Sequence, residues 1–194
     1  MKNLYNFIVQ SDKEILKDSL VHSEVFGIVY ERYHNKIFSH IYRLTQDVQV
    51  TEDLTEETFL QVIKKRKRII RSEAPFEHYI YRMATNNALR YFRDEERKRK
   101  AYNKLYTKQS IKDSISFPGR NGEKELIKAI NNLPRVKRIC IIMYYIEDKN
   151  IQEIAVTLDK GVSTISDILK KARKDLYDTL RKNWGERDNI YRGK

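Results

Sequence analysis

Residues 150–176 have the sequence NIQEIAVTLDKGVSTISDILKKARKDL, and this stretch decides the fold. Its apolar residues recur every three or four positions in two blocks, which predicts two short helices separated by a turn at residues 159–161. Asn150 is placed to cap the first helix, and Glu153 has the spacing of a capping box. Gly161 is expected to take the positive φ of the turn. The stretch predicts a helix-turn-helix with its second helix in a DNA major groove, although a plain helical hairpin has the same pattern.

The composition of the whole chain limits its class. The 194 residues include 39 Lys and Arg against 27 Asp and Glu, so the formal net charge is +12. That surplus points to nucleic acid or an anionic membrane surface as a partner, although a basic protein without such a partner remains an alternative. Six Gly and three Pro favour an all-α fold. The sequence shows no signal-peptide pattern and no apolar run of membrane-spanning length, so we expect no membrane insertion.

The single cysteine, Cys140, lies in the apolar run ICIIMYYI, which predicts a core residue rather than part of a disulfide framework. A chain of this kind suits the reducing cytoplasm. The four histidines lack ligand spacing, and no Gly-rich phosphate loop or CxxC pair is present in the sequence. We therefore expect no catalytic residues, no metal and no cofactor, and the sequence offers no support for an enzyme.

Helical periodicity divides the chain into two helical domains. The predicted divisions are an N-terminal extension and first helix at 1–22, a helical domain at 23–94, a polar linker at 95–122, a second helical domain at 123–184 and a fraying tail at 185–194. Ser11 with Glu14 and, further on, Ser23 are expected to cap helices. Later helices are predicted over about 51–70, 76–93, 123–133 and 135–145, with a break at 47–50 and Pro134 in a first turn.

The segment FEHYIYRMATNNALRYFR at 76–93 interleaves aromatic residues with arginines and the amides Asn86 and Asn87. Arginines bind phosphates, aromatic faces stack on unpaired bases, and amides recognise base edges. Four residues follow one helix face at spacings of four, four and three, and for these we favour nucleic-acid binding: Arg82, Asn86, Arg90 and Arg93. For Ile80 and Met83 a core role is favoured.

A second charged segment, TEDLTEETF at 51–59, opens the preceding helix with acidic residues. Such residues complement the helix dipole, and taken alone this explanation is favoured. Acidic residues followed by Phe59 in a basic chain could equally be a docking face for a basic partner.

Taken in order, these segments resemble a bacterial RNA polymerase sigma factor of the extracytoplasmic-function (ECF) group, over about residues 12–184. TEDLTEETFLQV is similar to the AEDLTQEVFLKV segment of the family's region 2, and FEHYIYRMATNNALRYFR to its FRAWLYRIARNLAIDYLR segment. LPRVKRICIIMYYIEDKNIQEIAVTL, with STISDILKKARKDL after it, resembles region 4.

The resemblance implies region 2 at 23–94 and region 4 at 123–184, with core RNA polymerase and promoter DNA as partners. It implies core-polymerase binding by Asp53, Glu56, Glu57 and Phe59. It implies capture of unpaired −10 bases by Tyr79, Arg82, Asn86, Arg90 and Arg93. It implies recognition of the −35 element by Ser163, Thr164, Ser166, Asp167, Lys170, Lys171 and Arg173. It also implies a membrane-linked anti-sigma factor as a partner and no catalytic centre, because the chemistry belongs to the polymerase.

Some residues depart from the family's usual pattern. Asp159 stands where glycine is usual, and Ser166, Asp167 and Ile168 stand where Lys, Ser and Arg are usual. Asp167 would repel phosphate or accept a hydrogen bond from a cytosine amino group. Arg90 replaces a usual Asp and Tyr79 a usual Trp. These changes leave the −35 sequence open.

Two other functions remain as alternatives. A stand-alone helix-turn-helix regulator would bind duplex DNA as a dimer, typically at a palindrome and without polymerase. A protein-only adaptor would show no salt-dependent binding of nucleic acid.

Overall fold

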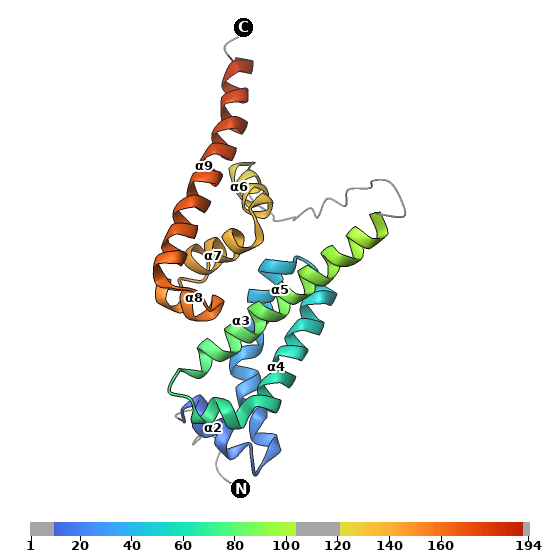
Figure 1. Cartoon of the computed structure of the whole chain (residues 1–194), viewed down its shortest axis with the longest axis vertical. Helices are drawn as coiled ribbons and strands as arrows, with labels where there is room; N and C mark the ends of the chain where they lie inside the picture. The colour runs from blue at the N-terminus through green and yellow to red at the C-terminus, as the bar shows by residue number, and fades with distance from the viewer. Residues whose placement is uncertain (1–9, 104–120, 192–194) are drawn as a thin grey trace. The chain divides into compact units, whose positions relative to one another are not determined.

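The computed structural model describes the backbone of residues 10–103 and 121–191, and side chains within these ranges up to residue 100 and from residue 125 to 181. Every regular element in these ranges is a helix, which confirms the predicted all-α fold (Figure 1). The chain divides into two units, Met1–Gln109 and Ser110–Lys194, called unit 1 and unit 2 below. Among the described helices, none has the combination of length and hydropathy needed to cross a bilayer.

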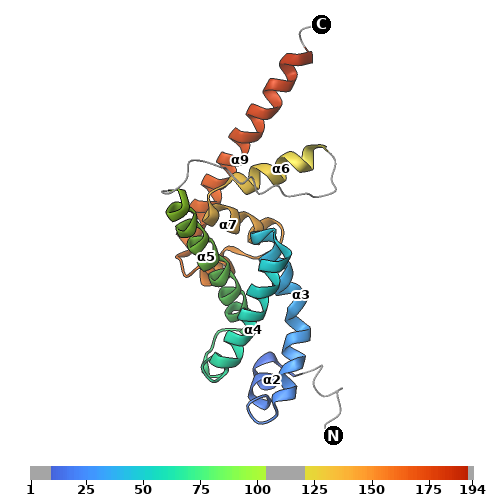
Figure 2. The ribbon, with the colours of Figure 1, turned by 90° about the vertical axis from the view of Figure 1, so that its right-hand side faces the viewer.

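Unit 1 is a bundle in which α4 packs against both α3 and α5. Its elements are α2 (Asp12–Asp18), the 3-10 turn η1 (Ser23–Val25), α3 (Phe26–Thr45), α4 (Val48–Arg71) and α5 (Phe76–Asn103). The first of these, α2, lies beside α3 at one end of the unit (Figures 1 and 2). The centre of the bundle consists of fully buried aliphatic side chains, among them Ile37, Ile41, Val62, Ile69 and Ile80.

Hydrogen bonds from α2 join it to α3 and to the turn between α4 and α5. The Asp12 carboxylate accepts from Arg32 Nη1 at 2.9 Å and from the Tyr33 hydroxyl at 2.6 Å, which ties α2 to α3. Burial and the Asp12 carboxylate raise the pKa of Tyr33 above its ordinary value. The ammonium of Lys13 donates to the carbonyl of Ser72, directly after α4. The start of α2 therefore holds the turn from which α5 begins.

The predicted helix starts are partly confirmed in unit 1. Ser11 and Glu14 form the expected capping box on α2. Ser23 was expected to cap a helix and does not, because it lies inside the 3-10 turn η1. The predicted break at 47–50 is also wrong, because the Asp47 side chain accepts from the Val50 amide at 3.0 Å and α4 already begins at Val48.

The predicted end of α5 near Arg93 is wrong as well. The helix continues to Asn103, through a charged segment predicted to belong to the linker. Side chains one turn apart pair along it: Asp94 with Arg97 at 3.6 Å, Glu95 with Lys98 at 2.9 Å and Glu96 with Lys100 at 2.9 Å. Such pairs support a helix that has no apolar face. Residues 104–120 of the predicted linker lie outside the described residues.

Unit 2 consists of α6 (Asn121–Asn132), α7 (Arg135–Tyr145), α8 (Ile151–Leu158) and α9 (Val162–Tyr191). Pro134 is the N-cap of α7 rather than a first-turn residue. The last helix, α9, passes the predicted end at residue 184, so the predicted fraying tail is helical as far as Tyr191. Residues 192–194 of that tail lie outside the described residues.

The core of unit 2 joins α9 to the helices before it. Fully or almost fully buried side chains come from three of these helices: Ile139 and Met143 from α7, Ile154 from α8, and Ile165 and Ala172 from α9. Lys137 Nζ lies 2.6 Å from Asp175 Oδ2 and links α7 to α9. Cys140 is buried, as predicted, and burial raises the pKa of its thiol to about 11.

Candidate nucleic-acid and protein interfaces

A groove of about 310 Å³ lies between α4 and α5 in unit 1. Residues from both helices line it: Gln61, Lys65, Arg68, Ile69, Tyr79, Arg82, Met83, Asn86, Asn87, Arg90 and Arg93. The side chains of Ile69 and Met83 are buried, so the groove has an apolar base beneath a cationic and aromatic rim. The structure thus brings together all five side chains that the sequence analysis associated with −10 DNA.

The α4 side of this groove was missed by the sequence analysis. Gln61, Lys65 and Arg68 line the groove from α4. Their spacing of four and three residues places them on one helix face and could have revealed the second wall. The sequence does not show that this face lies opposite α5, because helix pairing is a tertiary property.

A buried polar network supports the groove. Asn87 is 2% exposed. Its Oδ1 accepts from Gln61 Nε2 at 2.8 Å, and its Nδ2 donates to Thr58 Oγ1 at 3.0 Å. The Thr58 hydroxyl in turn donates to the carbonyl of Leu54 at 2.7 Å. Asn87 therefore joins the two helices, whereas Asn86, the amide for which nucleic-acid binding was favoured, is exposed.

Arg90, which lines the groove, forms an ion pair with Glu57. The Arg90 guanidinium contacts Glu57 Oε1, which also accepts from Gln61 Nε2 at 3.2 Å. Both charged side chains are partly exposed, so the pair contributes only about 0–1 kcal/mol to stability. The pair nevertheless joins two sites that the sequence analysis kept apart, because Glu57 was expected to bind polymerase and Arg90 to bind DNA.

The acidic face of α4 is only partly as expected. Asp53 and Glu56 are exposed, whereas Phe59 is 3% exposed, with its ring centroid 4.7 Å from that of Tyr30. Phe59 therefore belongs to the core beneath this face, which corrects the expectation that it lies on the surface. The exposed apolar side chain of the face is Leu60 at 53%. Its spacing of four residues from Glu56 could have identified it.

In unit 2, the helix-turn-helix begins as the sequence predicts. The Asn150 amide donates to Glu153 Oε2 at 2.8 Å and Asn150 Oδ1 accepts from the Glu153 amide at 2.9 Å, which confirms the capping box. The turn differs from the prediction, because Asp159 takes the left-handed conformation, with φ of 54°, and Gly161 does not. The chain must reverse directly after Leu158, two residues before the glycine is reached.

The first turns of α9 present one polar face. All seven residues that the sequence analysis associated with the −35 element are exposed there: Ser163, Thr164, Ser166, Asp167, Lys170, Lys171 and Arg173. The opposite face, with Ile165, Leu169 and Ala172, is buried against the rest of unit 2. The helix is therefore held by its apolar side and offers its polar side to a partner.

The residues that the structure describes contain no metal-binding cluster. Among these residues, no group of three or more His, Cys, Asp or Glu side chains is placed to hold a metal ion.

Comparisons with known proteins give these surfaces a context. The sequence model of Sigma-70 region 2 matches residues 29–98, and that of Sigma-70, region 4 matches residues 123–176. The ECF RNA polymerase sigma factor SigE of Mycolicibacterium smegmatis is 27% identical over 160 residues, which are 80% of this chain and 61% of SigE. The ECF RNA polymerase sigma factor SigX of Bacillus subtilis is 21% identical over 173 residues, which are 80% of this chain and 89% of SigX.

Solved structures share the fold. The sigma factor RpoE, solved with the anti-sigma factor NepR from Bartonella quintana, has a TM-score of 0.62 at 18% identity, over 80% of this chain and 96% of RpoE. CnrH, solved with the cytosolic domain of CnrY, has a TM-score of 0.63 at 16% identity, over 89% of this chain and 99% of CnrH. Regions 2 and 4 fall in unit 1 and unit 2, and sigma factors are initiation factors rather than enzymes. The chain therefore belongs to the ECF group of the sigma-70 family of RNA polymerase sigma factors.

Proposed function

We propose that this chain binds core RNA polymerase and directs it to promoters, with unit 1 opening the −10 element and unit 2 recognising the −35 element. The observation that carries the proposal is the α4–α5 groove, which lies within the region 2 match. There Tyr79, Arg82, Asn86, Arg90 and Arg93 come together around an apolar base.

The groove suits an unstacked base rather than a duplex. Its volume of about 310 Å³ is at the lower end of the range for small-molecule sites. Tyr79 is partly exposed and offers a ring for stacking, and the Arg82 guanidinium lies 5.9 Å from the centre of that ring. Arg90 and Arg93 are exposed for phosphates. Capture of a base in this groove would offset the few kcal/mol that unstacking costs.

The exposed polar face of α9 is our proposed −35 contact. A helix held by its apolar side and polar on the other is the geometry that enters a major groove. Ser163, Thr164 and Ser166 would hydrogen-bond at its N-terminal turns, and Lys170, Lys171 and Arg173 would bind phosphates. Asp167 would accept from a cytosine amino group.

The acidic face of α4 is our proposed core-polymerase contact. Asp53, Glu56 and Glu57 would meet a basic surface of the polymerase, with Leu60 as the apolar anchor and Phe59 supporting the face from below. Since RpoE and CnrH were each solved with an anti-sigma factor or a CnrY domain, we extend the proposal to an inhibitory partner of that kind. The site of action would be the cytoplasm, where the polymerase works.

The test is reconstitution with core polymerase. Pull-down should show a complex, and the complex should transcribe from a promoter found by footprinting. The double variant Arg82→Ala with Asn86→Ala should reduce open-complex formation severalfold and leave core binding unchanged. Loss of core binding in that variant would show that α5 has another role. Occupation of a duplex operator by a dimer without polymerase would favour a stand-alone regulator instead.

A further inference from the structure

The last two turns of α4 carry six cations in eight residues, from Lys64 to Arg71. They are Lys64, Lys65, Arg66, Lys67, Arg68 and Arg71. Among the described residues, no carboxylate lies within ion-pair distance of any of them. Like charges three or four residues apart destabilise a helix, so this cluster is unfavourable unless a polyanion covers it.

The helix dipole does not explain the cluster. The dipole favours cations only within the last turn, which holds Arg68 and Arg71. Lys64 and Lys65 lie a further turn inside. The charged end of α5 makes a useful contrast, because there Arg97, Lys98 and Lys100 each have an acidic partner one turn away.

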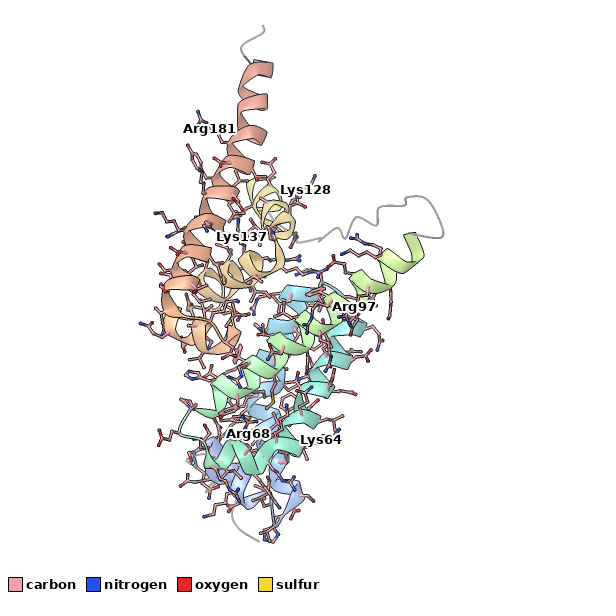
Figure 3. All side chains as sticks on the ribbon, in the orientation of Figure 1. Lys64, Arg68, Arg97, Lys128, Lys137 and Arg181 are labelled. Atoms are coloured by element: carbon pink, nitrogen blue, oxygen red, sulfur yellow. The ribbon has the colours of Figure 1, made fainter. Side chains whose placement is uncertain are left out.

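A second, shallower hollow of about 590 Å³ overlies these turns. It is lined by Lys64, Lys65, Lys67, Arg68, Arg71, Ser72 and Tyr79. Lys65, Arg68 and Tyr79 also line the α4–α5 groove, so the two hollows share a wall. Lys64 and Arg68 can be followed on α4 in Figure 3.

We propose that this basic end of α4, defined as Lys64, Lys65, Lys67, Arg68 and Arg71, binds the phosphates of single-stranded DNA that leaves the α4–α5 groove. The inference rests on the proposed function of that groove. A strand whose base stacks on Tyr79 in the groove is already unpaired. Because Tyr79 lines both hollows, the backbone of that strand passes directly to the cations of the second hollow. The cations of the second hollow, which have no acidic partner among the described residues, then attract the next phosphates of the same strand.

The test uses holoenzyme and two single-stranded probes. One probe carries only the −10 segment found by footprinting, and the other carries the same segment with a thymidine extension, added at either end in separate probes. The variant K64Q/K67Q/R71Q removes three cations that line only the second hollow. The matched control R97Q/K98Q/K100Q removes three cations that already have acidic partners. Glutamine keeps helix propensity, and circular dichroism checks the fold of both variants.

We expect the α4 variant to bind the extended probe at least tenfold more weakly at low salt. The slope of log K against log salt should fall by about 2, which is 0.7 for each of three lost phosphate contacts. The short probe and the control variant should be unaffected.

An unchanged slope on both extended probes, or an equal loss in the control variant, would overturn this inference alone. A loss seen only when the extension is double-stranded would overturn the assignment to single strands. Failure of the unmutated holoenzyme to bind promoter DNA would overturn the proposed function and this inference with it.

Discussion

The two units present their proposed DNA-binding residues in opposite ways. In unit 1 the residues line a groove between two helices, and a partly buried network of Thr58, Gln61 and Asn87 joins those helices. In unit 2 the residues stand on the exposed side of one helix, whose other side is apolar and buried. A concave polar site can enclose a single base, whereas a convex helix fits the groove of a duplex.

The two units should therefore be stabilised by different kinds of interaction. Unit 2 should depend on apolar packing beneath α9, and unit 1 also on hydrogen bonds between α4 and α5. Substitutions that remove one kind of interaction should therefore affect one unit and leave the other intact.

The largest effect is expected for Ile165→Ala in unit 2. Ile165 is completely buried beneath α9, so its truncation should destabilise unit 2 by about 3 kcal/mol. Cys140 provides the measurement, because it is the chain's single cysteine and its thiol is protected by burial and by its raised pKa of about 11. Thiol labelling near pH 8 should accelerate roughly 100-fold, since 1.36 kcal/mol corresponds to a factor of ten. Ile146→Ala is the matched control, because Ile146 is 48% exposed and should label at the unmutated rate.

A pair of neighbouring asparagines tests unit 1. Asn87→Ala removes a hydrogen-bond partner from both Gln61 and Thr58. The free energy of unfolding of unit 1 should fall by about 2 kcal/mol, and the amides of α4 and α5 should lose protection from hydrogen exchange. Asn86→Ala should change stability by less than about 0.5 kcal/mol, because Asn86 is exposed, but should weaken −10 binding. Cys140 labelling should stay constant in both variants. Equal loss of protection in the two variants would contradict the division between a structural and a functional amide.

These two asparagines also show where sequence reasoning succeeds and fails. The helical face of Arg82, Asn86, Arg90 and Arg93 follows from spacing alone, and the structure places all four along one groove. Adjacent residues on a helix point about 100° apart, so Asn87 faces α4 while Asn86 faces solvent. Which neighbour faces the partner helix depends on tertiary packing, and residue type does not reveal it.

The ends of the helices could be predicted where neighbouring residues determine them, and not elsewhere. Capping boxes at Ser11 and Asn150 are local, and both were predictable. The far end of α5 was not, because charged residues typical of a linker are equally compatible with a helix stabilised by acid–base pairs one turn apart. Phe59 was misplaced because its aromatic partners come from α3, which is distant in sequence.

The turn before α9 gives a smaller effect. Asp159→Gly should stabilise unit 2 by about 0.5 kcal/mol, because glycine adopts a left-handed φ without the penalty of a side chain, although it gains more entropy on unfolding. Gly161→Ala should cost at most about 0.5 kcal/mol, because an added Cβ would meet only Thr164 and Ser163 at ordinary contact distances. The rate of Cys140 labelling measures both changes. A large loss in Gly161→Ala would show that the glycine and not Asp159 carries the constraint.

The last substitution, Glu57→Gln, should affect DNA binding rather than stability. The Arg90–Glu57 pair is partly exposed, so its loss should change the free energy of unfolding by less than about 1 kcal/mol. Arg90 would then be available to a phosphate, and binding of the single-stranded −10 segment by holoenzyme should tighten by about threefold. Asp53→Gln is the control, because it removes an acidic residue from the same face without releasing an arginine. Weaker DNA binding in Glu57→Gln would show that Glu57 holds Arg90 in its binding position.

Asp159 has a consequence for the evolvability of this chain. Both aspartate codons, GAT and GAC, become glycine codons through one transition at the second base. A single nucleotide change is therefore enough to replace Asp159 by glycine and to remove the strain of its left-handed backbone. In a mutagenised library selected for heat resistance, that transition should be among the first changes recovered in unit 2.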